Sequence, residues 1–256
     1  MLRRNLSIKL KTREEIDIMR EAGRISALAL DAAGKAIAPG ISTKELDDIA
    51  RKCIESNGAI PSFLGVDGFP ATACISVNEE LVHCIPSSDK ILKEGDIVSI
   101  DVGAGISGFH GDNTRTFGCG KISDEAQHLI DVTSKSLEIG IDAAKVGNKI
   151  GDIGFAIQSY VESFGYSIIK SYVGHGIGRD VHEAPSVPNF GKRHSGEILA
   201  PGLVIAIEPM VSVGSAELES LAPGGWNVVT KDRSLCAHVE HTVAITEEGT
   251  FILTQL

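Results

Sequence analysis

Four acidic residues stand at or near the ends of strand-like runs, where they could act together. Asp101 follows the β-branched run Ile97–Ile100, and Asp112 comes after a glycine-rich stretch that permits a turn. Because side chains alternate between the two faces of a strand, Asp101 and Asp112 can meet across a hairpin. Glu208 and Glu240 hold similar positions later in the chain.

Buried carboxylates are costly without partners, and the matching positions nearby offer little lysine or arginine. Two divalent cations would balance four carboxylates, and such ions lie about 3.5–4 Å apart in two-metal hydrolases. The alternative interpretation is four ordinary acids at solvent-exposed strand ends. The four acids therefore make a metal centre the first hypothesis to weigh.

A weak internal repeat connects the two pairs of acids. The pattern L-x-x-G-x-x-x-x-I-acid occurs at Leu92–Asp101 and again at Leu199–Glu208. A second pattern, H-x-acid-x-T, occurs at His110–Thr114 and again at His238–Thr242. Because both patterns recur in the same order, they indicate a duplicated α/β unit in which each copy carries two acids.

Several histidines lie near these acids in the sequence. His175 sits in the glycine-lined segment Gly174–Arg179, which could hold a metal ligand or form a flexible turn. The segment is not a dinucleotide-binding fingerprint, because its glycines alternate strictly. His182 follows, and His83 stands among apolar residues, where a lone histidine is more often a hydrogen-bonded core residue than a catalyst. We interpret His110, His238 and His241 as partners that orient the acids, and His128 and His194 as surface residues.

Helices and strands must alternate to position these groups. Capping boxes at Thr12–Glu15 and Ser42–Glu45 each mark the start of a helix. The four expected helices run from Thr12 to about Lys35, from Ser42 to about Asn57, and over about Ser123–Ala144 and Asp152–Phe164. The expected strands are Ala71–Val77, Ile97–Val102, Thr114–Phe117, Tyr166–Val173, Leu203–Ile207 and Val239–Ile245.

Composition limits the class of protein. The 256 residues are 43% hydrophobic, which suits one large domain or two closely packed halves. The net charge of −10, without a block of lysine or arginine, argues against nucleic acid or an anionic membrane surface as the main partner. We expect no transmembrane helix and no signal peptide. Five cysteines without paired spacing indicate reduced thiols and a cytoplasmic location.

The ordered set Asp101, Asp112, His175, Glu208 and Glu240 resembles the five metal ligands of type I methionine aminopeptidases. The resemblance extends over nearly the whole chain, through IKLKTREEIDIMREAG, CISVNEELVHCIP, DIVSIDVGAGISGFHGDNTRTF, YVGHGIGRDVHEAP, AIEPM and AHVEHTVAIT. It implies an α+β, pita-bread (creatinase/aminopeptidase) fold with two pseudo-symmetric α/β halves around a curved antiparallel sheet. It also implies a single catalytic domain over residues 1–256, with residues 1–10 as a short N-terminal segment.

The same resemblance implies how two divalent ions would be held. Asp112 and Glu240 would bridge the ions, Asp101 would hold one of them, and His175 with Glu208 would complete the other. Oxygen ligands with one imidazole suit borderline-hard divalent ions and leave positions open for water. Cobalt, manganese, iron, zinc and nickel all remain candidates.

The implied activity is the removal of the initiator methionine from nascent polypeptides, with a preference for a small second residue. Glu208 would act as general base. His182 would hydrogen-bond the carbonyl oxygen as it becomes an oxyanion, and His83 would position the scissile amide. The resemblance further implies a cytoplasmic monomer and leaves room for association with the ribosome.

An apolar pocket for the methionine side chain is also implied. Valines at positions 66 and 181 replace the aromatic residues common in relatives, which predicts a roomier pocket. Cys84 follows His83 where glycine is usual, which predicts a thiol near the entrance that is sensitive to oxidation or alkylation. The pocket residues are Phe63, Val66, Phe69, Cys74, Val181 and Trp226. Ordinary core packing is the alternative for each of them.

Three other interpretations share this fold. Xaa-Pro aminopeptidases and prolidases usually carry a long N-terminal domain, whereas His83 lies early in this chain. Type II methionine aminopeptidases carry a large insertion between the second histidine and the third acid, but only a short segment separates His182 from Glu208. A non-catalytic binding protein on the same fold would lose metal ligands, and all five are intact here.

Overall fold

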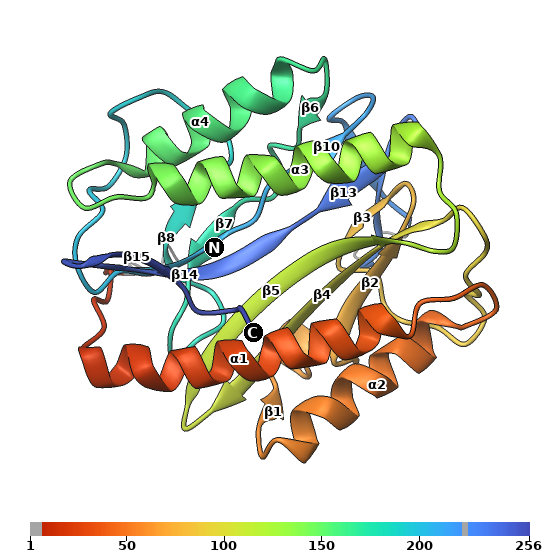
Figure 1. The fold of residues 1–256 in the computed structure, drawn as a ribbon, viewed down its shortest axis with the longest axis horizontal. Coiled ribbons are helices and arrows are strands. Elements are labelled where there is room, and N and C mark those ends of the chain that lie inside the picture. The colour runs from red at the N-terminus through yellow and green to blue at the C-terminus, as the bar shows by residue number, and fades with distance from the viewer. Residues whose placement is uncertain (1–6, 222–224) are drawn as a thin grey trace.

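The computed structural model describes residues 7–221 and 225–256, and a large antiparallel sheet forms their centre (Figure 1). Within these residues the sheet has the order β1-β4-β5-β14-β9-β7-β8, with β2 added beside β4 and β15 beside β14. Its strands are β1 (Ile60–Pro61), β2 (Ala73–Val77), β4 (Ile97–Ile106), β5 (Phe109–Gly118), β7 (Gly174–Gly176), β8 (Glu183–Val187), β9 (Val204–Ile207), β14 (Glu240–Thr246) and β15 (Gly249–Ile252).

Among the residues that the structure describes, two small sheets accompany the large one. The first has the order β13-β10-β6, and the second has the order β11-β12-β3. Their strands are β13 (Cys236–His238), β10 (Met210–Ser212), β6 (Ser167–Ile168), β11 (Leu218–Ser220), β12 (Val228–Thr230) and β3 (Glu80–Val82).

The helices begin where side-chain caps fix them. They are α1 (Arg13–Lys35), α2 (Thr43–Ser56), α3 (Asp124–Ala143) and α4 (Ile150–Glu162), with one short 3₁₀ helix, η1 (Val66–Gly68). Both expected capping boxes are present, at Thr12 with Glu15 and at Ser42 with Glu45. Helix α4 begins two residues before the expected Asp152, because the Asp152 carboxylate accepts a hydrogen bond from the Lys149 amide at 2.8 Å. The four helix predictions are otherwise confirmed within two residues.

The hairpin between β4 and β5 confirms the expected meeting of two acids. Asp101 lies opposite Thr114 and Asp112 lies opposite Gly103, so the two acids are diagonal neighbours on one face. The turn is Ser107–Gly108, and both residues have positive φ, at 51° and 76°. Such a two-residue turn matches the twist of the strands that it joins.

Several strand predictions need correction. Strand β4 continues beyond the expected Val102 to Ile106, and β5 begins at Phe109 rather than at Thr114. The expected strand Tyr166–Val173 is wrong, because only Ser167 and Ile168 pair as a strand, against the three-residue partner β10. The expected strand Val239–Ile245 begins one residue later. The Val239 amide donates to the Pro209 carbonyl at 3.3 Å, and this contact separates β13 from β14. His238 and Glu240 therefore lie on different strands.

Two similar halves meet at the centre of the sheet, as the repeat predicted. The β4–β5 pair and the β9–β14 pair are both antiparallel, and β5 joins β14 through Thr114 opposite Glu240. One apolar core lies under α1 and α2, around Ile25, Leu46 and Ile100. The other lies under α3 and α4, around Leu129. Figure 1 shows the two helix pairs on opposite sides of the central strands.

Each helix pair is amphipathic and buries one face against its half of the sheet. In the part of the chain that the structure describes, no helix has the length and apolar character needed to cross a bilayer. The two apolar cores lie under the two helix pairs. Polar side chains from both halves gather between them, at the seam where β5 pairs with β14.

Candidate active site

A cavity of about 450 Å³ opens at the seam between the two halves. This volume lies within the range of small-molecule sites in proteins. All of the ligand and catalytic candidates from the sequence line this single cavity, namely Asp101, Asp112, His175, Glu208, Glu240, His83 and His182. The residues that the two sequence patterns singled out in separate halves are therefore brought together by the fold.

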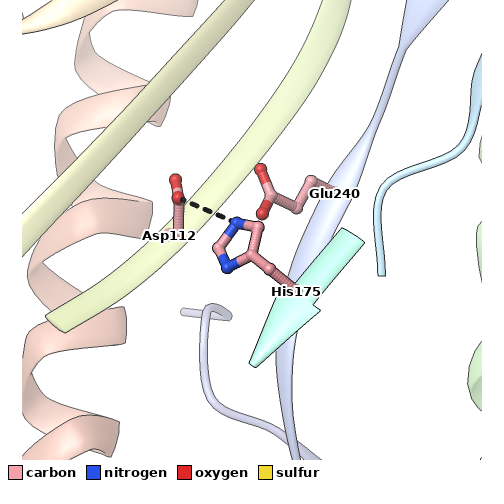
Figure 2. A group of neighbouring side chains, drawn as sticks. All are labelled: Asp112, His175 and Glu240. Carbon is pink, nitrogen blue, oxygen red and sulfur yellow. Dashed lines mark ion pairs between the residues drawn. The ribbon is translucent and has the colours of Figure 1, made fainter. Parts of the chain in front are cut away.

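Three of these side chains converge from three strands. Asp112 on β5, His175 on β7 and Glu240 on β14 have ligand atoms that all lie within 4.8 Å of one another. Figure 2 shows the three side chains directed toward one another. The His175 Nε2 atom is 4.0 Å from Asp112 Oδ2 and 3.7 Å from Glu208 Oε1. Glu208, which directly follows the end of β9, thus lies beside this group.

The carboxylates lack the partners that buried charges need. Asp112, Glu208 and Glu240 are buried, and one oxygen each of Asp101, Asp112 and Glu240 is buried without a hydrogen bond. Across the described residues, no lysine or arginine forms an ion pair with these four acids. Burial, followed by the charges of Glu240 and Asp101, raises the pKa of Asp112 well above its usual range.

A divalent cation would resolve this arrangement. Clustered carboxylate oxygens beside one imidazole form a donor set that such ions accept, and bound positive charge would offset the crowding of negative charge. The residues present therefore fit a divalent metal centre. Thr114 supports it from β5, because its hydroxyl donates to Glu240 Oε2 at 2.8 Å and leaves Oε1 free.

The tautomer of His175 follows from its hydrogen bond. Its Nδ1 atom lies 2.9 Å from the Gly176 carbonyl, which can only accept, so Nδ1 carries the proton. The Nε2 lone pair then faces the carboxylates. Burial, with a contribution from His182, lowers the pKa of His175 to about 3, so the ring is neutral at pH 7. A neutral imidazole with a fixed tautomer is the form that binds a metal.

The histidines next to the acids have different roles in the structure. His238 lies against an acid as expected, with its Nε2 atom 3.3 Å from Glu208 Oε2. The predictions for His110 and His241 are wrong. His110 hydrogen-bonds the Ser62 hydroxyl at 2.8 Å, and His241 hydrogen-bonds the Thr254 hydroxyl at 2.9 Å. Neighbours on a strand face opposite ways, so His241 turns away from the site that Glu240 enters. As expected, His128 and His194 are exposed.

His83 and His182 flank the acids from two loops. The backbone of His83 has a φ of 60°, which is uncommon for a residue other than glycine and is often found at functional sites. Its ring stacks edge-on against Tyr172, with centroids 5.3 Å apart. Burial, with contributions from His238 and His182, lowers the pKa of His83 to about 4. The exposed ring of His182 lies 4.4 Å from that of His175, measured between centroids.

Apolar side chains form one wall of the cavity. Phe63, Val66, Phe69, Cys74 and Trp226 line it, and the rings of Phe69 and Trp226 pack edge-on at 5.3 Å. Val181 is buried in the same apolar cluster but does not line the cavity, so its placement in the pocket is a correction. Sequence reasoning missed Asp67 and Tyr172, which also line the cavity. Each could have been found from its neighbours in the sequence, because Asp67 follows Val66 and Tyr172 begins the motif that contains His175.

Cys84 does not stand at the entrance, which corrects the sequence-based expectation. Its side chain is buried, does not line the cavity of the acids, and borders a separate hollow with Glu80 and Asn227. Burial, followed by the charge of Glu80, raises the pKa of the thiol to about 12. The thiolate is the reactive form of cysteine, so a raised pKa lowers reactivity.

We therefore expect Cys84 to resist alkylation in the folded protein. Iodoacetamide at pH 8 should modify Cys84 far more slowly than the partly exposed Cys53, and unfolding in guanidinium should remove the difference. Peptide mass spectrometry after timed quenching measures both rates. Rapid modification of Cys84 in the native protein, accompanied by inactivation, would restore the expectation of an exposed thiol.

The scaffold and the site together define a metal-dependent hydrolase. Clustered acids and a neutral imidazole adjoin an apolar cavity, and each half of a duplicated α+β fold supplies part of the set. The chain belongs to metallopeptidase family M24, whose family model matches residues 17–247.

Relatives match over almost the whole chain. A protein named methionine aminopeptidase 1 from Bacillus subtilis is 53% identical, over 96% of this chain and 98% of that protein. The crystal structure of methionine aminopeptidase from Thermotoga maritima has a TM-score of 0.95 and 42% identity, and the match covers 98% of this chain and all of that one. A prolidase from Pyrococcus furiosus has a TM-score of 0.79 at 26% identity, over 96% of this chain and 65% of the prolidase. The pita-bread fold expected from the sequence is confirmed.

Proposed function

We propose that this enzyme hydrolyses the first peptide bond of polypeptides that begin with methionine and so removes the initiator methionine from new proteins. The observation that carries the proposal is the cavity, in which an apolar wall adjoins the clustered acids. An apolar wall that includes the polarisable sulfur of Cys74 suits a thioether side chain. The names of the relatives from Bacillus subtilis and Thermotoga maritima support the same activity.

Two divalent ions are proposed at the acids. The side chains that would hold them are Asp101, Asp112, His175, Glu208 and Glu240, which all line the cavity. Membership of a metallopeptidase family supports divalent ions, and cobalt, manganese, iron, zinc and nickel are the candidates. When bound, such ions polarise the scissile carbonyl and lower the pKa of water.

The chain's own side chains would carry the proton and orient the substrate. Glu208 would accept a proton from the attacking water and pass it to the leaving amide nitrogen. His182 would donate a hydrogen bond to the carbonyl oxygen as negative charge develops there. His83 would position the scissile amide. All three line the cavity, which supports these assignments.

Binding of the methionine side chain is assigned to Phe63, Val66, Phe69, Cys74 and Trp226, with Val181 packed behind them. We also propose a preference for a small second residue, as the family resemblance implies. We further propose that residues 1–256 act as one catalytic domain, a cytoplasmic monomer that meets its substrates near the ribosome.

A prolidase or Xaa-Pro aminopeptidase is the alternative on the same fold. The match to the prolidase has lower identity and covers a smaller share of that protein than the matches to methionine aminopeptidases. A non-catalytic binding protein is the second alternative. It is disfavoured because all five proposed ligands are present and line one cavity.

A chelator-stripped sample should distinguish these alternatives. We expect no cleavage without metal, and restored cleavage of Met-Ala-Ser, but not of Ala-Pro or Met-Lys peptides, after addition of one of the candidate ions. Metal should also raise the thermal unfolding midpoint, because a ligand at about a hundredfold excess over its Kd stabilises by roughly 2.7 kcal/mol. Cleavage of Ala-Pro would favour the prolidase reading. A protein that binds no divalent ion would favour the binding module.

A further inference from the structure

A buried ion pair joins the segment before α1 to the edge of the active site. The Lys11 Nζ atom lies 2.7 Å from Glu183 Oε2, and only 4% and 5% of the two side chains are exposed. Lysine is rarely buried to this degree unless it is paired. None of the roles proposed above uses this pair.

The other oxygen of Glu183 holds a loop in place. Glu183 Oε1 accepts hydrogen bonds from the amides of Arg179 at 2.9 Å and Asp180 at 3.3 Å. These amides belong to residues 177–182, which join β7 to β8 and which we call the β7–β8 loop. The loop ends at His182, which lines the cavity. The carboxylate therefore connects Lys11 to the loop that carries His182.

Lys11 is itself firmly attached to the sheet. Its amide donates to the Gly202 carbonyl at 2.7 Å, and the Gly202 amide donates to Ile245 on β14 at 2.8 Å. Its ammonium also donates to the Lys9 carbonyl at 3.0 Å. The lysine stem fills the space beside Gly178, where an added Cβ would lie 2.5 Å from Lys11 Cε. A rigid anchor thus contacts the inner side of the loop.

The charge of Lys11 keeps Glu183 able to hold both amides. Burial alone would raise the pKa of Glu183, but the hydrogen bond and charge of Lys11 and the two amides outweigh burial and lower it. Without the ammonium, a buried carboxylate would lose its counter-charge. Water entry or outward movement of the loop would relieve that cost, and either change would release the amides that hold the loop.

We propose that Lys11 is a positioning residue for His182, acting through Glu183 and the β7–β8 loop. The proposal rests on the function assigned above, because the position of His182 matters most when His182 contacts the reacting carbonyl. In this proposal the segment before α1 helps to hold the active site in position, although it is distant from His182 in the sequence.

Lys11→Met in the metal-loaded full chain is the test. We expect kcat for Met-Ala-Ser to fall at least tenfold, with KM within about twofold and metal content unchanged. The double variant Lys11→Met/His182→Ala should be no slower than His182→Ala alone, because the effect of Lys11 passes through His182. Lys11→Gln, which keeps a donor toward Glu183, should fall between the wild type and Lys11→Met, and it replaces Lys11→Met if that variant does not fold.

Lys44→Met is a control elsewhere in the chain, at a lysine that is more exposed than Lys11 and also pairs with Asp48. Lys44 Nζ lies 3.3 Å from the buried Asp47, and Asp47 Oδ1 accepts the amides of Thr72 and Ala73, both at 2.9 Å. The control therefore removes a lysine from a buried carboxylate that holds two successive amides, but not the loop of His182. We expect it to leave kcat unchanged.

Hydrogen exchange gives a readout that does not depend on turnover. The amides of Arg179 and Asp180 should exchange faster in Lys11→Met than in the wild type, and at the wild-type rate in Lys44→Met. An unchanged kcat and exchange rate, or rate losses that add in the double variant, would overturn the positioning role. A wild-type enzyme that fails to cleave Met-Ala-Ser, while the loop still loosens in Lys11→Met, would instead overturn the proposed function.

Discussion

Glu208→Gln is expected to abolish methionine removal, with a loss of turnover of roughly 10³-fold or more. The change removes the proposed general base, whose contribution alone is typically about 10²–10⁴-fold. It also removes an anionic ligand 3.7 Å from His175 Nε2 while keeping the volume of the side chain. Single-turnover assays with Met-Ala-Ser at saturating metal measure the loss.

Excess metal separates the two functions assigned to Glu208. If Glu208 were only a ligand, raising the ion concentration should restore turnover, whereas loss of the base should persist. Glu80→Gln is the matched control, because Glu80 is also buried but pairs with Lys90 outside the cavity of the acids. Retained turnover in Glu208→Gln would exclude this site as the catalytic centre.

His182→Ala should lower kcat by about 10²–10³-fold and leave metal binding nearly unchanged. Removal of one oxyanion donor typically has an effect of this size. The ring of His182 lies 4.4 Å from that of His175, but the family resemblance assigns His182 a hydrogen bond to the substrate carbonyl and does not place it among the five ligands. Steady-state kinetics and metal analysis on the same preparation test both parts.

A different result would change the assignment of His182. Loss of metal as the main effect would make it a ligand, and a raised KM at constant kcat would make it a binding residue only. The kcat of His182→Ala should then be compared with that of Lys11→Met, because both variants should slow the step in which His182 contacts the substrate carbonyl. His194→Ala is a suitable control, since His194 is an exposed histidine outside the cavity.

The helices were the part of the fold most readily predicted. A capping box is a contact between residues three positions apart. Thr12 with Glu15 and Ser42 with Glu45 therefore predict where their helices begin without any contact distant in the sequence. The duplicated patterns also predicted the two halves, and the alternation of side chains across a hairpin predicted the face shared by Asp101 and Asp112. The resemblance to a known family supplied the five proposed metal ligands, and the fold places all five along one cavity.

The wrong predictions concern strand pairing and side-chain direction, which depend on contacts between residues distant in the sequence. Tyr166–Val173 has the composition of a strand, but only Ser167 and Ile168 pair with β10. Cys84 follows a cavity residue, yet its side chain faces a separate hollow. Val181 packs in the same apolar cluster as the pocket residues but does not line the cavity. Residues that are neighbours in the sequence lie close together in the fold, but their side chains can point in different directions. The packing of the surrounding chain decides those directions.

By itself, the sequence determined which chemical groups are available, where helices begin and that the chain contains two related units, because these features depend on residue type and on contacts a few positions apart. Only the tertiary structure decided that Asp112, His175 and Glu240 converge, and that the His175 Nε2 lone pair faces the acids. It alone paired Lys11 with Glu183, 172 positions away. Such contacts form because folding buries charged groups together, and a buried charge is stable only where the rest of the chain supplies its partner.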